Sequence, residues 1–255
     1  MAIELSRIDE FALIRFNRPE ALNALSFKLV GDLAAAIDEV AKSDARALLF
    51  TGAGAKAFCA GADIAELAGR TLMQTRAGAE RGQAMLERLE HLPMPSVAIV
   101  NGYAFGGGLE VALACTFRLV TPNAKVALPE IKLGLIPGYG GTQRLPRVIG
   151  QARALEMILT GKAIDAQTAL AWGLASRLVE GDPVEAGIAF AREFSGYSLP
   201  VLALAREAVM RAHDTPIHEG LKIEADLSTL AFQTADATEG TAAFVSKRKP
   251  VFKDR

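Results

Sequence analysis

Short apolar runs that end at a glycine recur along the first half of the chain and restrict it to few fold classes. Residues 47–50 (Ala-Leu-Leu-Phe) lead to Gly52, and residues 96–100 (Ser-Val-Ala-Ile-Val) lead to Gly102. A short run that is apolar at nearly every position is typical of a buried strand, and here such strands alternate with helical patterns. The sequence therefore predicts an α/β fold.

Helical patterns alternate with these strands. Ser26 is placed to cap a helix that runs to about Lys42 with one apolar face. A second amphipathic helix covers residues 73–92 and stops before Pro93 and Pro95. Further strands are predicted at residues 3–8, 11–16, 117–121 and 125–128.

The pattern becomes mainly helical after about residue 150, with one predicted strand at 175–179. Helices are predicted at residues 152–160, 165–172, 184–194, 199–213 and 217–235. We divide the chain near Ser195 and Gly196 into an α/β core, residues 1–195, and a helical region, residues 196–255. The helical region has more apolar surface than a short segment buries alone, so we predict an oligomer interface formed by Leu221, Ile223, Leu227, Leu230 and Phe232.

Composition narrows the possible partners. The chain has 255 residues and a formal net charge of −1, so no overall field attracts nucleic acid or an anionic membrane. No apolar run approaches the roughly 20 residues of a membrane-spanning helix, and residues 1–6 do not resemble a signal peptide. Cys59 and Cys115 are too few for a disulfide framework, so we expect a reducing, cytoplasmic compartment.

Three glycine-rich segments are candidate ligand sites. The first, residues 51–57, fits the G-x-G-x-x-A pattern of a dinucleotide-binding turn. That motif opens a long helix and is followed by an acidic residue about 20 positions later. Here residues 58–63 form a further small-residue loop, and residues 70–73 include no acidic side chain. A nicotinamide-dependent dehydrogenase is therefore disfavoured.

The second segment has three consecutive glycines, residues 106–108, before Glu110. Backbone N–H groups at the start of a helix lack helical partners and suit an anionic oxygen. A tight turn explains one such glycine better than three. The neighbours of Glu110 are apolar, so its carboxylate is either functional, paired with a cation such as Arg118, or simply favourable at the helix N-terminus.

The third segment covers residues 128–144. Glu130 follows Pro129 at the end of a short predicted strand, where its side chain either points into a pocket or is a solvated loop carboxylate. Residues 138–141 (Gly-Tyr-Gly-Gly) allow another close backbone approach, or the start of another helix near Thr142.

Together these residues resemble the crotonase superfamily, and within it the enoyl-CoA hydratases. The resemblance implies a crotonase-like (ClpP-like) α/β spiral of ββα units, with a C-terminal helical region that forms a homotrimer or a dimer of trimers. It extends over nearly the whole chain, in blocks at residues 17–25, 56–64, 101–110, 129–134 with 138–145, and 240–244 with 247–250.

The resemblance also implies an activity, the reversible addition of water across the 2,3 double bond of a 2-enoyl-CoA thioester. On this basis the N–H groups of Ala62 and Gly107 form an oxyanion hole. Glu110 and Glu130 hold the water, and Glu130 protonates the α-carbon. The implied partner is an acyl-CoA substrate, with no metal, no nucleic acid and no cofactor beyond the coenzyme A of the substrate. The implied coenzyme A contacts are Lys56, Ala60, Gly61, Ala62, Asp63 and Ile64, with Lys249 from the basic tail.

Elementary chemistry agrees with this assignment. An enolate formed from a thioester carries negative charge that two fixed N–H donors stabilise, and hydration needs one base and one acid. No histidine lies in the glycine-rich segments, so a Ser–His–Asp triad is not supported, and no metal-binding spacing occurs. Some members carry a lysine where this chain has Ala65, so that phosphate contact is not predicted here.

Three alternatives stay open: an enoyl-CoA isomerase, another crotonase-type acyl-CoA lyase, and a non-catalytic acyl-CoA-binding or RNA-associated member of the fold. An enoyl-CoA isomerase commonly works with one acidic residue, and a non-catalytic acyl-CoA-binding or RNA-associated member should have lost one or both. This chain has both Glu110 and Glu130, which favours hydration.

Overall fold

The computed structural model describes residues 2–254 and contains two mainly parallel sheets. Strand β1 is antiparallel to β2, and β9 is antiparallel to β8, whereas the other neighbouring strands are parallel. The large sheet has the order β1 (Ile3–Ile8), β2 (Phe11–Phe16), β3 (Ala47–Gly52), β5 (Ser96–Val100), β7 (Phe117–Val120), β10 (Arg177–Leu178). The small sheet has the order β4 (Ala57–Cys59), β6 (Tyr103–Phe105), β8 (Lys125–Ala127), β9 (Ile164–Asp165).

A repeating unit relates the two sheets. Strands β3, β5 and β7 belong to the large sheet, and the strand that follows each of them, β4, β6 or β8, belongs to the small one. Helix α2 (Leu72–Glu90) completes the first unit and α3 (Gly107–Ala114) the second. The predicted α/β class and ββα repeat are therefore confirmed. The strands β4, β6 and β9 were not predicted, because each has two or three residues and two of them lie within glycine-rich segments.

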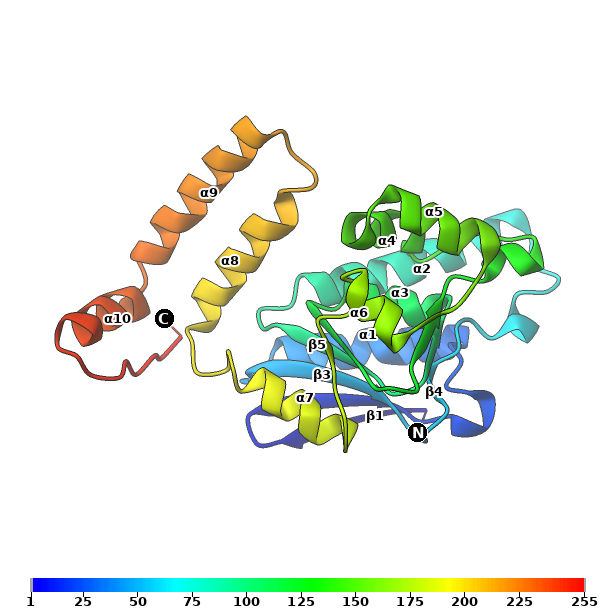
Figure 1. The fold of residues 1–255 in the computed structure, drawn as a ribbon, viewed down its shortest axis with the longest axis horizontal. Helices are drawn as coiled ribbons and strands as arrows, with labels where there is room; N and C mark the ends of the chain where they lie inside the picture. Colours follow the sequence, from blue (N-terminus) through cyan, green and yellow to red (C-terminus); the bar gives the residue numbers. More distant parts are fainter. Residues whose placement is uncertain (1, 255) are drawn as a thin grey trace.

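Both faces of the large sheet are buried, as the apolar strands predict. Helices α1 (Phe27–Ala41), α2 and α3 pack on one face, and α7 (Pro183–Ala191) packs on the other (Figure 1). Leu49 and Ile99 point towards α7, where they form a cluster with Phe190. A Cβ on Gly187 would lie 2.2 Å from the Ile99 side chain, so glycine lets α7 approach the sheet.

Most predicted helices are present with shifted ends. Ser26 caps α1 as predicted, since its side chain accepts a hydrogen bond from the Leu29 N–H. Thr71 and Gln74 form a capping box at the start of α2, one residue earlier than predicted. The predicted helix 217–235 is wrong at its end, because Thr234 caps a separate helix there. The remaining helices are α4 (Gly141–Ile149), α5 (Gln151–Thr160), α6 (Ala166–Ala171), α8 (Leu199–Arg211), α9 (Ile217–Phe232) and α10 (Ala235–Val245).

Helices α8 to α10 form an arm beside the core. Figure 1 shows α8 and α9 as a helical hairpin, with α10 at the end of the molecule away from β4. Within residues 2–254, neither α8 nor α9 contains a buried residue, and no helix is long and apolar enough to cross a membrane. Large apolar side chains exposed on the arm are Val209, Met210, Ile217, Leu221, Leu230, Phe232, Phe244 and Val245.

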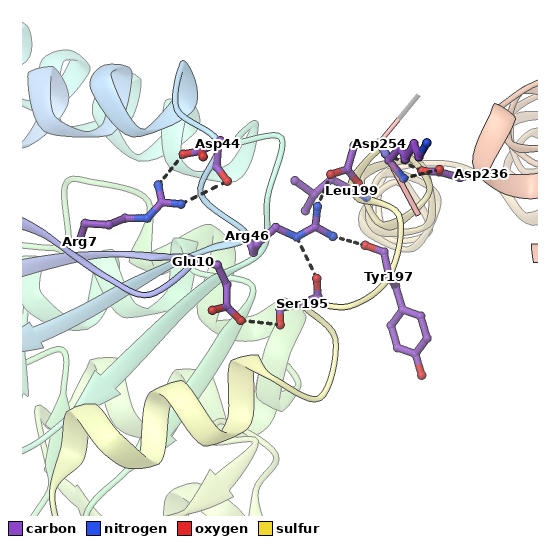
Figure 2. Close-up of polar contacts among 10 residues, drawn as sticks. Arg7, Glu10, Asp44, Arg46, Ser195, Tyr197, Leu199, Asp236 and Asp254 are labelled. Atoms are coloured by element: carbon purple, nitrogen blue, oxygen red, sulfur yellow. Dashed lines mark hydrogen bonds and ion pairs between the residues drawn. The ribbon is translucent and has the colours of Figure 1, made fainter. Parts of the chain in front are cut away.

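Arg46 joins the core to the start of the arm (Figure 2). Its guanidinium donates to the backbone oxygens of Ser195, at 2.8 Å, and Tyr197, at 2.5 Å, and pairs with the carboxylate of Asp254. Asp254 also accepts a hydrogen bond of 2.7 Å from the Leu199 N–H, at the first residue of α8. One arginine thus holds the connection between core and arm together with the segment that follows α10.

Candidate active site

Glu110 is a buried carboxylate in the first turn of α3, with 2% of its surface exposed. Its Oε1 accepts hydrogen bonds from the backbone N–H groups of Tyr139, at 2.8 Å, and Gly141, at 2.7 Å. Arg118 instead donates to backbone carbonyl oxygens, among them that of Cys115 at 2.7 Å. The carboxylate is therefore oriented by a neighbouring loop rather than by an ion pair with Arg118.

The loop that holds Glu110 begins helix α4. A Cβ on Gly141 would lie 3.1 Å from the Glu110 Oε1, so residues 138–141 provide both the close approach and the helix start that the sequence left open. Arg144 donates to the Tyr139 carbonyl oxygen at 2.9 Å and makes two 2.6 Å hydrogen bonds to the Glu90 carboxylate. A bidentate pair of this kind restricts the loop, and with it the N–H groups that face Glu110.

Glu130 opens the 3-10 helix η3 (Glu130–Leu133) and points back towards the glycine-rich segment. A Cβ on Gly106 would lie 2.7 Å from the Glu130 Oε1. The Oε2 atom is buried and has no hydrogen-bond partner among residues 2–254. The alternative of a fully solvated loop carboxylate is therefore wrong.

The two carboxyl groups influence each other electrostatically. Burial raises the pKa of Glu110 to about 7, the hydrogen bond from the Gly141 N–H opposes this shift, and the charge of Glu130 adds to it. Burial also raises the pKa of Glu130 above its usual range. A carboxyl group whose pKa is raised keeps its proton to a higher pH than an exposed glutamate does, so it can serve as an acid as well as a base.

The chain around Ala62 is pressed against the start of α3. Gly61 has φ 101°, and a Cβ there would lie 2.9 Å from the Phe105 carbonyl oxygen and 3.6 Å from the Gly107 nitrogen. Gly107 is the first residue of α3, so its N–H has no acceptor within the helix. Ala62 and Gly107 are thus carried by adjacent segments.

The Ala62 N–H is directed by a parallel bridge to Leu25. Leu25 donates to the Gly61 carbonyl oxygen at 2.7 Å and accepts from the Asp63 N–H at 2.9 Å. In a parallel bridge, Leu25 bonds to the residues on either side of Ala62, and the N–H of Ala62 itself points away from Leu25. Leu25 therefore leaves the Ala62 N–H unused.

The predicted coenzyme A contacts are divided between two regions. Lys56 lines a cavity of about 330 Å³ with Pro19 and Leu22, and the segment from Ala60 to Ile64 continues from it. Asp63 lies 3.5 Å from the Arg18 guanidinium, and Ile64 is 53% exposed. Lys249 follows α10, and its neighbours Arg248 and Val251 both bond to Glu239 of that helix. Helix α10 lies at the end of the molecule away from β4 (Figure 1). A single chain therefore does not bring Lys249 to the others.

The structure also adds residues that the sequence analysis missed. Tyr139, Arg144 and Glu90 determine how Glu110 is held, but nothing in their local sequence marks Arg144 and Glu90 as a pair. The Gly-Tyr-Gly-Gly run was the one available signal for the loop. Cys59 and Cys115 are both buried, and burial raises the pKa of each thiol to about 12.

Replacing Glu110 with glutamine should stabilise the fold above neutral pH. A carboxyl group whose pKa rises from 4.5 to about 7 on folding stabilises the protein at low pH and loses that contribution as the pH increases from 4.5 to 7. At about 1.4 kcal/mol per pH unit, Glu110→Gln should raise the free energy of unfolding at pH 8 by up to about 3 kcal/mol.

Urea denaturation at pH 8 and pH 4.5 measures this difference. Glu224→Gln, at an exposed position of the arm, is the matched control and should change little. A Glu110→Gln protein less stable than wild type at pH 8 would contradict the expectation.

Known proteins resemble this chain along its whole length. The sequence profile of the family described as enoyl-CoA hydratase/isomerase matches residues 8–255. The Rhizobium meliloti protein named "Probable enoyl-CoA hydratase" is 41% identical over 244 residues, 95% of this chain and 94% of its own. The crotonyl-CoA hydratase of Syntrophomonas wolfei is 38% identical over 253 residues, 98% of this chain and 97% of its own.

A solved structure gives the same result in three dimensions. The crystal structure of enoyl-CoA hydratase from Bacillus anthracis superposes with a TM-score of 0.94 over 100% of both chains, at 37% identity. This superposition confirms the fold that the sequence resemblance implied. The chain belongs to the enoyl-CoA hydratase/isomerase family.

Proposed function

We propose that this protein is an enoyl-CoA hydratase, which adds water reversibly to a 2-enoyl-CoA thioester and yields a 3-hydroxyacyl-CoA. One observation carries the proposal: two carboxyl groups with raised pKa values, Glu110 and Glu130, lie beside the start of α3, close enough that the charge of Glu130 raises the pKa of Glu110. Hydration needs a base for the water and an acid for the α-carbon, and this pair can supply both.

In the proposed reaction the thioester oxygen binds between the N–H groups of Ala62 and Gly107. Negative charge develops on that oxygen as the enolate forms, and donors that are already oriented stabilise it without rearrangement. The start of α3, which carries the Gly107 donor, packs directly on β4. A Cβ on Gly108 would lie 2.0 Å from the Cys59 carbonyl oxygen, so only glycine allows this contact. The helix start thus cannot move away from β4 without losing its packing.

Water is held between the two carboxyl groups. Glu110 accepts a proton from the water as the water oxygen bonds to the β-carbon, and Glu130 gives a proton to the α-carbon. A proton then passes from Glu110 to Glu130, which restores both groups, so the sum of these steps is the addition of one water molecule. The unpartnered, buried Oε2 of Glu130 supports this assignment, because a buried polar atom without a protein partner is available to a ligand.

Coenzyme A is proposed to lie along Lys56 and the segment from Ala60 to Ile64, next to the 330 Å³ cavity. Lys249 belongs to the segment held on α10, away from β4, so we propose that it approaches the phosphates from another subunit. We propose no cofactor beyond the coenzyme A of the substrate. The buried free thiols of Cys59 and Cys115 support a reducing, cytoplasmic compartment.

A panel of 2-enoyl-CoA thioesters tests the proposed reaction. Hydration removes the absorbance of the conjugated double bond and forms a 3-hydroxyacyl-CoA, which mass spectrometry identifies by the added water. An isomerase would instead convert a 3-enoyl-CoA without any change in mass. Double-bond migration without water addition would refute the hydratase assignment.

The arm is proposed to assemble the protein into a homotrimer or a dimer of trimers, with the core at residues 1–195 and the arm at 196–255. The absence of buried residues in α8 and α9 supports an apolar contact with another subunit. Removing residues 196–255 should give a smaller or insoluble species.

Point substitutions test the same interface without removing the arm. Leu230→Asp with Phe232→Asp should lower the oligomeric mass in sedimentation velocity, because the two side chains are 55% and 70% exposed in the single chain. Leu159→Asp, at a 64% exposed position of α5, is the matched control. An unchanged mass for the arm variant, or a soluble, active monomer after truncation, would place the interface elsewhere.

A further inference from the structure

Tyr139 contacts the site in two independent ways. Its backbone N–H donates to Glu110 at 2.8 Å. Its ring lies between α2 and α3: a Cβ on Gly82 would be 2.2 Å from the ring atom Cδ1, and a Cβ on Gly107 would be 3.6 Å from Cδ2. One edge of the ring therefore faces α2, and the other faces the proposed oxyanion donor.

Gly82 makes room for this ring. A Cβ at position 82 would overlap Cγ, Cδ1 and Cε1 of Tyr139, at 2.2 to 2.6 Å. Glycine in the middle of a helix is destabilising, yet α2 has one at this point. Tyr139 as a whole is 9% exposed, and its ring packs between the two helices.

In the proposed reaction an acyl chain would pass directly beside this ring. In the proposed reaction the thioester oxygen is at the Gly107 N–H, and the β-carbon meets the water held by Glu110 and Glu130. The next carbon of the substrate therefore leaves from between Gly107 and Glu110. Tyr139 borders both of these residues, and α2 closes the far side of its ring.

We infer that Tyr139 closes the acyl compartment and restricts the protein to short-chain 2-enoyl-CoA thioesters. This inference rests on the proposed function and adds to it the class of substrate. The backbone of Tyr139 positions Glu110, while its side chain sets the length of the acyl group. A substitution that preserves the backbone N–H changes only the second property.

The experiment compares kcat/KM for 2-enoyl-CoA thioesters of four to ten carbons in wild type, Tyr139→Ala and Tyr139→Phe. For wild type we expect a fall on the order of 10–200-fold between four and eight carbons, the range that a misfitting methylene group produces in an apolar pocket. Tyr139→Ala should raise the ratio of kcat/KM for the eight-carbon substrate to kcat/KM for the four-carbon substrate by a similar factor. The readout is this ratio within one variant and not the absolute kcat, because Tyr139 also positions Glu110 through its backbone N–H.

Two further variants act as controls. Tyr139→Phe retains the ring and should retain the wild-type preference. Tyr197→Ala removes a tyrosine ring that is 57% exposed at the start of the arm, and it should change nothing. If Tyr139→Ala does not fold, Tyr139→Leu is the substitute, since it leaves a smaller void and still removes the ring.

A binding measurement separates this inference from the proposed reaction. Calorimetry with butanoyl-CoA and octanoyl-CoA, which cannot be hydrated, should show the same preference for the short chain and its loss in Tyr139→Ala. If binding shows this preference but no 2-enoyl-CoA is hydrated, the inference about chain length holds and the proposed hydratase activity is rejected. Equal handling of all chain lengths by wild type, or an unchanged preference in Tyr139→Ala, overturns the inference.

Discussion

Replacing Glu110 or Glu130 with glutamine is expected to lower kcat for hydration by roughly 10²–10⁴-fold. Glutamine keeps the shape of either side chain but cannot exchange a proton. At position 110 it can still accept the hydrogen bonds from the Tyr139 and Gly141 N–H groups. In the proposed mechanism the two groups act on one water molecule, so the double variant should lose less than the product of the two single losses.

The stability expected of Glu110→Gln makes this loss interpretable. That variant should be more stable than wild type at pH 8, so a fall in kcat could not be attributed to unfolding. Glu224→Gln again serves as the matched control.

The pair also separates hydration from isomerisation. An isomerase moves one proton between two carbons with one carboxyl group, so Glu130→Gln should then leave double-bond migration in a 3-enoyl-CoA largely intact. The measurement is kcat for both reactions in wild type and each single variant. Hydration that survives Glu130→Gln within about tenfold of wild type would reject our assignment.

Gly107→Pro is expected to lower kcat on the order of 10²–10³-fold, the loss typical of removing one oxyanion donor. Proline has no N–H, and the first position of a helix tolerates it because that N–H has no helical acceptor. Position 107 has no positive φ, so the backbone there accepts residues other than glycine.

Gly107→Ala is the matched control for this variant. Both substitutions place a carbon about where a Cβ would lie 3.1 Å from the Leu25 side chain, but only proline removes the N–H. Stopped-flow measurement of the hydration step in both proteins, with folding checked by circular dichroism, isolates the donor. Equal activity of the two variants would show that the Gly107 N–H contributes nothing to the transition state.

Elements that depend on local pattern were predictable from the sequence. Strands β3 and β5 are continuous apolar runs, and Ser26 caps α1 where its spacing predicts. By contrast, β4 and β6 have three residues each and exist because they pair with each other and with β8. No window of the sequence contains that information.

The candidate site divides in the same way. Glu110 and Glu130 stand out because carboxylates are unexpected beside apolar residues and glycines. The partners of Glu110 lie 29 and 31 residues away and are backbone N–H groups, which have no side-chain identity to recognise. The pairing of Arg144 with Glu90 across 54 residues is equally invisible before folding.

The junction at Arg46 has a consequence for the order in which a nascent chain matures. Its carboxylate partner, Asp254, is 208 residues later in the sequence. At about 5–20 residues per second, translation separates the two by roughly 10–40 s. The core can fold during that interval. The contacts of Arg46 with the Ser195 and Tyr197 carbonyl oxygens then form without the ion pair to Asp254. We therefore expect the arm to take its final orientation only after residue 254 has been synthesised, and the proposed subunit contact to form later still.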